Sequence, residues 1–301
     1  MKRTEKLDIH PSLKKYFGYD TFRPLQEDII HNVLDKRDTL VIMPTGGGKS
    51  LCFQIPALVF DGLTIVISPL IALMKDQVDG LNANGISASF FNSSQDPKTQ
   101  QTILEQVALK TLKLLYVAPE SLSFLSQILN EECISCIAVD EAHCISSWGH
   151  DFRPSYQRLG FLKETLPNTP IIALTATADK ATRQDIKAQL CIPEADQFIS
   201  SFDRANISLD VRVGLDRMKK IGDFVKNNSN ESGIIYCLSR KTTEQVASKL
   251  KSLGHSAEAY HAGLDFIERS AVQDAFICDK IKIVCATVAF GMGIDKSNVR
   301  Y

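Results

Sequence analysis

Residues 43–50, MPTGGGKS, follow an apolar run and precede the helix-compatible segment LCFQIPALVF. Glycines let backbone N–H groups turn inward around phosphates, and the N-terminus of the following helix favours negative charge. We expect Lys49 to reach the outer phosphates and Ser50 to hold a magnesium ion. Met43 stands where the full pattern has its first glycine, so an ordinary glycine-rich turn remains the alternative. The residues predicted to hold the nucleotide phosphates are Thr45, Gly46, Gly47, Gly48, Lys49 and Ser50.

Two adjacent carboxylates follow the apolar run ISCIAV. Ligands of parallel sheets bind at the carboxyl ends of the strands, where Asp140 and Glu141 would then lie. Asp140 is suited to hold Mg²⁺ through its water shell, and Glu141 to orient or deprotonate the water that attacks the γ-phosphate. A solvated acidic strand end is the alternative, which is common for one carboxylate and less so for two.

Short runs of Val, Ile and Leu alternate with longer amphipathic stretches, which indicates an α/β fold with parallel sheets. A more polar stretch separates two sets of these runs, so we expect a domain boundary near residues 203–210. The strands predicted before it are 39–43, 63–68, 113–117, 134–139 and 170–175. Those predicted after it are 233–237, a weaker run at 256–260, and 281–287.

Length, charge and hydropathy limit the class of protein. A chain of 301 residues exceeds what one compact domain usually holds, so two domains are expected. The net charge of −1 excludes a globally basic nucleic-acid binder but allows local contacts with phosphates. No apolar stretch reaches the ~18 residues of a membrane span, and the start lacks the apolar core of a signal peptide. We therefore expect a cytoplasmic protein, nucleoid-associated if it is bacterial, that makes no membrane contact.

Five motifs together resemble the RecQ family of DNA helicases in superfamily two: TGGGKS, DEAH, LTATA, SPLIALMKDQV and YVAPE. The similarity runs along essentially the whole chain, and AFGMGID with CISSWGHDFRP separates RecQ-like proteins from DEAD-box RNA helicases. The resemblance implies two tandem RecA-like parallel-sheet domains, 1–205 and 206–301, the second incomplete. In FGYDTFRPLQEDII it also implies that Tyr19 stacks on adenine while Arg23 and Gln26 hydrogen-bond the base.

The segment after DEAH contains the only tryptophan of the chain. In RecQ-like enzymes this segment is an aromatic-rich loop that senses single-stranded DNA, which implies that role for Trp148, Phe152 and Arg153. Bases stack on aromatic faces with little sequence preference, and arginine adds charge and cation–π attraction. The alternative is that both aromatic side chains pack under the nucleotide site.

Further contacts are expected at strand ends. Thr175 and Thr177 are placed to hydrogen-bond both the Asp140–Glu141 region and the second domain. The resemblance also implies contacts with the DNA backbone, which carry little sequence preference. The second-domain positions that match are Ser239, Arg240, His261, Gly263 and Thr287.

The expected function is that of an ATP-dependent DNA helicase of 3′ to 5′ polarity in DNA repair and recombination. Its cofactors would be ATP and Mg²⁺, and its partners single-stranded and partly duplex DNA; protein partners are not indicated. The sequence stops at NVRY, before the position where RecQ helicases carry the arginine-finger motif, as expected of either a fragment or a natural truncation. A nucleotide-gated DNA-binding module without productive unwinding is therefore the alternative. An RNA helicase is a third possibility, which the aromatic loop argues against.

Overall fold

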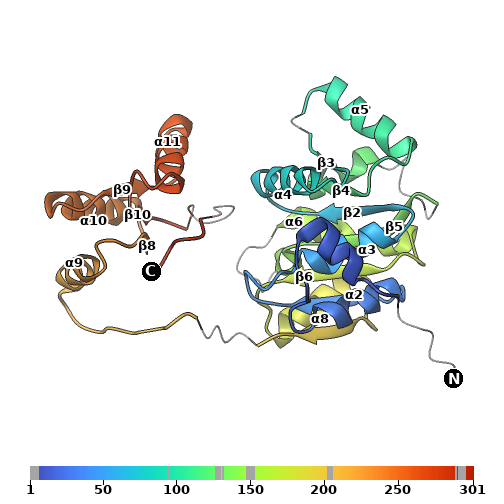
Figure 1. Ribbon diagram of the computed structural model, residues 1–301, viewed down its shortest axis with the longest axis horizontal. Coiled ribbons are helices and arrows are strands. Elements are labelled where there is room, and N and C mark those ends of the chain that lie inside the picture. The colour runs from blue at the N-terminus through green and yellow to red at the C-terminus, as the bar shows by residue number, and fades with distance from the viewer. Residues whose placement is uncertain are drawn as a thin grey trace. The chain divides into compact units, whose positions relative to one another are not determined.

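The computed structural model describes residues 7–93, 95–125, 130, 132–146, 153–201, 206–288, 290 and 296–301. The chain divides into two compact units, Met1–Asn206 and Ile207–Tyr301. In Figure 1 the first unit runs from blue to yellow and the second from orange to red. In the described part of the chain, no helix has the length and apolar character needed to cross a bilayer.

A seven-stranded sheet forms the centre of the first unit, and all its strand pairs are parallel. The strands lie in the order β3-β4-β2-β5-β6-β1-β7. Their bounds are β1 Thr39–Ile42, β2 Leu63–Ile67, β3 Ala88–Phe91, β4 Leu114–Val117, β5 Ile134–Val139, β6 Ile171–Thr175 and β7 Asp196–Ile199.

Helices cover both faces of this sheet. Strand β1 is therefore buried on both sides, which explains why its sequence is continuously apolar. Leu40 and Ile42 pack into one core cluster, whereas Val41, which points to the opposite face, packs into another. Every residue of such a strand is buried, so an alternating polar pattern is absent. The first face is covered by α5 Pro97–Ala108, α7 Phe161–Thr165 and α8 Lys180–Gln189, and the second by α2 Gln26–Leu34, α3 Leu51–Val59 and α4 Ile71–Ala83.

Shorter helices complete the first unit. They are α1 His10–Ser12, the π-helix Leu13–Phe17, α6 Pro154–Gln157, and the 3₁₀ helices Pro119–Leu125, Ala142–Ile145 and Arg158–Gly160.

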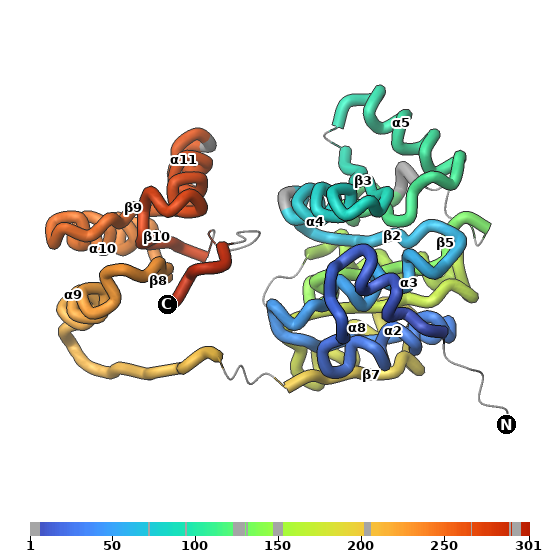
Figure 2. The backbone as a smooth tube through the Cα atoms, viewed as in Figure 1, coloured from blue at the N-terminus to red at the C-terminus, as the bar shows by residue number. Residues whose placement is uncertain are grey.

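The predicted α/β fold is confirmed, but two strands of the first unit were not predicted. These are β3 and β7, which form the two edges of the sheet and lie at opposite ends of the unit in Figure 2. An edge strand is paired on one side and partly exposed, so ASFF and DQFI lack the long apolar run of a central strand.

The second unit has a three-stranded parallel sheet in the order β8-β10-β9. The strands are β8 Gly233–Tyr236, β9 Ala257–Tyr260 and β10 Ile283–Ala286, and the helices are α9 Arg217–Asn227, α10 Arg240–Ser252 and α11 Phe266–Ile277. All three strands lie within predicted runs. A bridge between Ser232 and Val299 extends the outer side of β8.

We predict that limited proteolysis cuts first within residues 207–216. This stretch contains no helix or strand, and Leu209, Val211, Val213 and Leu215 are 84–102% exposed. An extended, exposed backbone fits a protease active site without local unfolding. Brief chymotrypsin digestion followed by intact-mass analysis should release a resistant fragment close to the first unit. First cuts inside α3, α4 or the strands of the seven-stranded sheet would contradict this expectation.

Candidate functional site

Three predicted motifs meet at the carboxyl ends of neighbouring central strands. The glycine-rich loop follows β1, Thr175 ends β6, and Asp140 follows β5. Because β6 pairs with both β5 and β1, it brings these ends to one edge of the sheet. The Met43 N–H donates to the Thr175 carbonyl at 3.1 Å, and the Asp140 N–H donates to the Ile67 carbonyl at 2.9 Å.

The glycine-rich loop has the backbone conformation that its sequence implies. Gly46 and Gly48 both have a φ of +79°, which favours glycine. A Cβ on Gly47 would lie 2.9 Å from the Pro44 carbonyl oxygen, so that position has no room for a side chain. Met43 does not have a positive φ and is buried in the core. A glycine is therefore unnecessary there, which accounts for the departure from the full motif.

Lys49 lies between the loop and the first turn of α3. Its Nζ donates to the Met43 carbonyl at 3.2 Å, and its side chain is only partly buried. Ser50 is the residue before α3, and its hydroxyl makes no capping bond with that helix. Both polar groups therefore lie at the positively polarised N-terminus of a nine-residue helix, where an anion is stabilised.

Arg23 and Gln26 hold the outer side of the glycine-rich loop. Arg23 Nη1 donates to the Gly46 carbonyl, and Gln26 Nε2 donates to the Gly48 carbonyl at 3.0 Å. The Arg23 N–H in turn donates to Gln26 Oε1 at 2.8 Å. Gln26 is buried, whereas Tyr19 is 56% exposed. In this structure the two side chains shape the loop itself, and their contact with a base remains a prediction.

Asp140 and Glu141 share a compact hydrogen-bonded turn with His143. The Glu141 N–H donates to Asp140 Oδ1 at 3.0 Å, and Glu141 has a φ of +48°, rare for a residue with a Cβ. Glu141 Oε2 lies 3.3 Å from His143 Nδ1. His143 Nδ1 also lies 2.9 Å from the Thr175 hydroxyl, so this imidazole connects the carboxylate turn to β6.

Burial raises the pKa of Asp140 to about 6, and the nearby charge of Glu141 acts in the same direction. The positive charge of Lys49 lowers that pKa, but by less. The negative charge of Asp140 is therefore incompletely compensated by its neighbours. A divalent cation at this carboxylate would supply the missing positive charge, and carboxylate and hydroxyl oxygens are ligands that Mg²⁺ accepts.

Thr175 and Thr177 adopt a local turn after β6. The Thr175 hydroxyl donates to the Thr177 carbonyl at 3.2 Å and accepts from the Thr177 N–H at 3.3 Å. Thr175 is buried and Thr177 is exposed. Of the two, Thr175 contacts the DEAH turn, and a contact of Thr177 with the second unit remains a prediction.

The segment after DEAH returns to the site at residues 153–156. Trp148 and Phe152 lie outside the described residues. Arg153 Nη1 donates to the Pro69 carbonyl at 2.8 Å, and Ser155 Oγ donates to Glu120 Oε1 at 2.8 Å. The Tyr156 hydroxyl donates to the Asp140 carbonyl at 3.1 Å.

These last contacts were not predicted from sequence. Tyr156 is 16 residues from Asp140, and Ser155 is 35 residues from Glu120, so only the folded chain brings them together. The only sequence feature that points to the partners in these contacts is their place in two motifs: Glu120 belongs to YVAPE and Pro69 to SPLIALMKDQV.

In the second unit, the predicted residues gather near the start of α10 and the end of β9. Ser239 Oγ accepts from the Thr242 N–H at 3.1 Å and caps α10. His261 is buried: its Nε2 lies 3.0 Å from Glu244 Oε1, and its Nδ1 accepts from the Gly263 N–H at 3.2 Å. His261 therefore positions the Gly263 turn in this structure, and a contact of its ring with DNA remains a prediction.

Arg240 and Thr287 lie close to this cluster. A Cβ on Gly263 would lie 3.2 Å from Arg240 Cδ, so a glycine lets the two segments approach. The Thr287 N–H donates to the Tyr260 carbonyl at 3.2 Å, which places Thr287 beside the end of β9.

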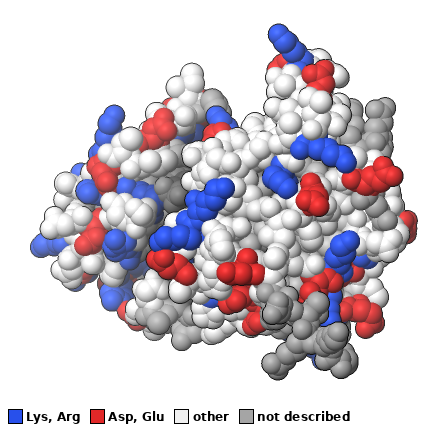
Figure 3. All heavy atoms as spheres, turned by 45° about the vertical axis from the view of Figure 1, so that its right-hand side comes forward, with Lys and Arg blue, Asp and Glu red and all other residues white. Residues whose placement is uncertain are grey.

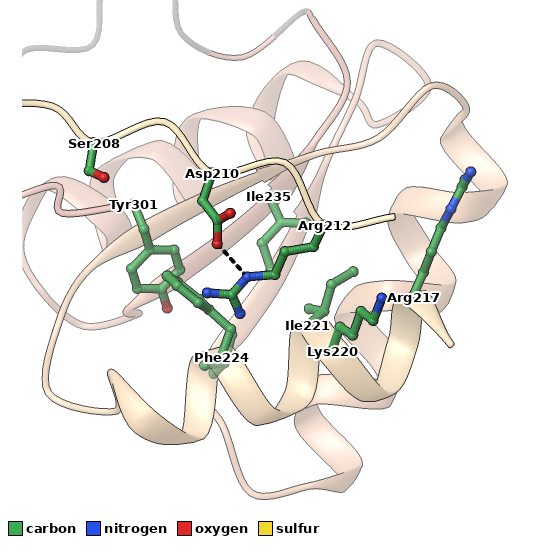
Figure 4. A pocket seen from close by; sticks show the side chains of 10 residues that line it. Ser208, Asp210, Arg212, Arg217, Lys220, Ile221, Phe224, Ile235 and Tyr301 are labelled. Carbon is green, nitrogen blue, oxygen red and sulfur yellow. Dashed lines mark hydrogen bonds and ion pairs between the residues drawn. The ribbon is translucent and has the colours of Figure 1, made fainter. Parts of the chain in front are cut away.

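A separate hollow in the second unit contains none of the predicted site residues. Figure 4 shows it between the extended segment 208–212, α9 and Tyr301. Arg212 Nε donates to Asp210 Oδ2 at 2.6 Å within it. We assign this hollow no part in the site.

Comparisons with known proteins agree with the arrangement of motifs. The family described as DEAD/DEAH box helicase matches residues 23–186, and the family described as Helicase conserved C-terminal domain matches residues 216–301. ATP-dependent DNA helicase RecQ of Haemophilus influenzae is 53% identical over 302 residues, which cover 100% of this chain and 49% of that protein. RecQ of Bacillus subtilis is 45% identical over 96% of this chain and 50% of its own length. The chain thus spans about half the length of these relatives.

Solved structures of lower identity share the fold. Saccharomyces cerevisiae Dbp5 bound to RNA and ADP BeF3 is similar with a TM-score of 0.71 and 19% identity, over 98% of this chain and 77% of that one. The DUF1998 helicase MrfA bound to DNA has a TM-score of 0.70 and 17% identity, over 99% of this chain and 46% of that one.

We predict that Asp140→Asn stabilises the nucleotide-free protein more at pH 7.5 than at pH 5. The folded-state pKa of about 6 exceeds the ordinary value of 3.8, so the folded protein binds this proton more tightly than the unfolded chain does. Stability contributed by protonation is therefore lost as pH rises from about 4 to 6, and the neutral amide avoids that loss. Thermal denaturation at both pH values should show a gain of roughly 2–4 °C at pH 7.5 and a smaller one at pH 5.

The matched control is Asp61→Asn, which removes one negative charge from an exposed position. An equal Tm change at both pH values in Asp140→Asn would contradict the assigned cause.

Proposed function

Because the chain belongs to the DEAD/DEAH box helicase family, and within it to the RecQ family of superfamily two, we propose that it couples ATP hydrolysis to 3′ to 5′ movement along single-stranded DNA. Duplex unwinding in DNA repair and recombination follows from that movement. What supports the proposal is the arrangement of the strand ends: β6 pairs with both β1 and β5, so the glycine-rich loop with Lys49 and the Asp140–Glu141 turn follow neighbouring strands at one edge of the sheet. A phosphate-facing lysine and a metal-facing carboxylate at one sheet edge are what nucleoside triphosphate hydrolysis requires.

The nucleotide would bind at the N-terminus of α3. The N–H groups of the glycine-rich loop and Lys49 would hold the phosphates, while the exposed Tyr19 ring would stack on the base. Arg23 and Gln26 lie at the outer side of that loop, so a contact with the base would require only local movement of their side chains. Ser50 and Asp140 would hold Mg²⁺, which, when bound, neutralises charge on the phosphate oxygens.

Glu141 would orient and deprotonate the attacking water. Its carboxylate lies beside His143, which the Thr175 hydroxyl holds in turn, so the general base has a defined orientation. The left-handed backbone of Glu141 is a local strain of the kind that active sites retain.

The DNA strand would contact both units. In the first unit we assign the contact to Trp148, Phe152 and Arg153, and in the second to Ser239, Arg240, His261, Gly263 and Thr287. On the face drawn in Figure 3, acidic and basic side chains are interspersed, which agrees with the net charge of −1. Affinity would therefore come from local backbone contacts and stacking, with little dependence on sequence.

We predict that Glu141→Gln lowers the kcat for ATP hydrolysis by about 10² to 10⁴-fold while ATP affinity changes little. The amide keeps the size of the carboxylate but cannot accept the proton of water. Lys49→Ala should instead weaken nucleotide binding itself, because it removes a phosphate-facing charge. Steady-state ATPase assays with single-stranded DNA and binding of a fluorescent ATP analogue separate the two effects. Collapse of nucleotide binding in a folded Glu141→Gln protein would make Glu141 a structural residue, and normal ATPase activity in folded Lys49→Ala would refute the phosphate loop.

We predict that Trp148→Ala leaves basal ATPase activity near that of the parent and reduces its stimulation by single-stranded DNA. Loss of the indole removes a stacking contact of ~1–3 kcal/mol per base. If Trp148 were instead a buried packing residue, its truncation would cost ~3–5 kcal/mol and lower the Tm sharply. Measuring the Tm and the ratio of stimulated to basal ATPase activity on one preparation distinguishes these roles. A large loss of Tm with an unchanged ratio would refute the sensor assignment.

A strand-displacement assay tests the complete proposal. A duplex with a 3′ single-stranded tail should be unwound with ATP and Mg²⁺, and one with a 5′ tail should not. ATP hydrolysis stimulated by DNA without any unwinding would favour the nucleotide-gated DNA-binding module instead.

A further inference from the structure

A buried amide connects three elements behind the site. Gln54 lies on α3, four residues after Ser50, and is 5% exposed. Its Nε2 donates to Gln77 Oε1 on α4 at 3.2 Å and to the Tyr116 hydroxyl on β4 at 3.3 Å. Both N–H groups of one side-chain amide are therefore used, each for a different element.

This network is polar where its surroundings are apolar. The other buried residues of α3 are Cys52, Phe53, Ile55, Pro56 and Ala57. A polar group in such a place is costly to bury and strongly directional once it is satisfied. Burial raises the pKa of Tyr116, so the phenol keeps its proton. The negative charge of Asp140 raises this pKa further. The network therefore joins α3, α4 and β4 by directional contacts within their shared apolar core.

Each of the three elements leads to a different part of the site. Helix α3 begins directly after the phosphate loop. Helix α4 begins directly after the irregular segment Ser68–Leu70, in which the Pro69 carbonyl accepts from Arg153. Strand β4 leads to Glu120, which accepts from Ser155. Two anchors of residues 153–155, Pro69 and Glu120, thus lie in the segments next to α4 and β4, which Gln54 contacts; a third is the Cys144 carbonyl, which accepts from the Arg153 N–H at 2.9 Å.

We propose that Gln54 is a positioning residue that couples nucleotide binding at the phosphate loop to the anchoring of residues 153–155, and so to the affinity for single-stranded DNA. The proposal rests on the proposed function. A shift of α3 on nucleotide binding would be passed by the Gln54 amide to α4 and β4, and through the Pro69 and Glu120 contacts to the DNA-binding segment. Coupling of this kind is reciprocal, so it can be measured from the DNA side alone.

The test measures the Kd for a fluorescent single-stranded oligonucleotide by anisotropy, with and without AMP-PNP and Mg²⁺. The ratio of the two Kd values reports the coupling. Tyr116→Phe removes one hydroxyl, and Gln77→Leu removes one acceptor, so each deletes one contact of Gln54. Since one hydrogen bond changes an equilibrium by about fivefold, we expect each variant to move the ratio toward one by about that factor. ATP affinity without DNA should stay within about twofold of the parent, because neither residue contacts the phosphate loop.

Ile103→Val is the matched control. Ile103 is buried on α5 in the core cluster of the opposite sheet face, so this change causes a small loss of Tm without touching the network. Its Kd ratio should equal that of the parent.

The results distinguish the proposed function from the role of Gln54. A parent ratio of one would count against nucleotide–DNA coupling as such, and so against the proposed function together with the relay. A parent ratio different from one that Tyr116→Phe and Gln77→Leu both preserve would overturn the role of Gln54 alone. An equal change in Ile103→Val would assign the effect to general destabilisation and also overturn it.

Discussion

The carboxylate of Asp140 is held at the end of a buried strand with incomplete charge compensation, and the organisation of the site depends on this constraint. Burial raises its pKa to about 6, and the positive charge of Lys49 in the glycine-rich loop lowers that pKa by less. A site with unmet negative charge beside a helix N-terminus and a lysine attracts a cation and an anion together. Bound Mg²⁺ and nucleotide phosphates would satisfy both demands at once. Their binding would offset the free energy lost in burying Asp140.

Parallel pairing makes this geometry possible. The Met43 and Asp140 N–H groups each donate to the terminal residue of a neighbouring strand, so the loops that follow begin at fixed positions. Local groups then define the details: Arg23 and Gln26 hold the glycine-rich loop, and His143 holds Glu141 against Thr175. The same edge also receives residues 153–156 through the contacts of Arg153, Ser155 and Tyr156. In the first unit, the groups proposed for hydrolysis and Arg153, proposed for DNA binding, thus lie at one edge of the sheet.

The second unit supplies a different kind of surface. Its predicted residues surround a turn in which His261 is fully engaged with Glu244 and Gly263. Among the described residues here, the exposed Arg240 side chain and the backbone near Gly263 remain accessible to a phosphate backbone, whereas the Ser239 hydroxyl caps α10. Such groups would hold a strand without reading its bases, as the proposed movement along DNA of any sequence requires.

The sequence by itself determined the fold class, the central strands and the position of the glycine-rich loop, because each depends on local composition: continuous apolar runs, glycines and a following helix. It also indicated Asp140 and Glu141, since the end of a buried strand can be located in the sequence as the end of an apolar run. It did not reveal β3 and β7, whose edge positions remove the apolar signal. Only the tertiary structure decided why Met43 can replace a glycine, that His261 is buried, and that Gln54, Tyr116 and Gln77 form one network. Those facts depend on burial and on contacts between residues up to 62 positions apart, which a linear pattern does not contain.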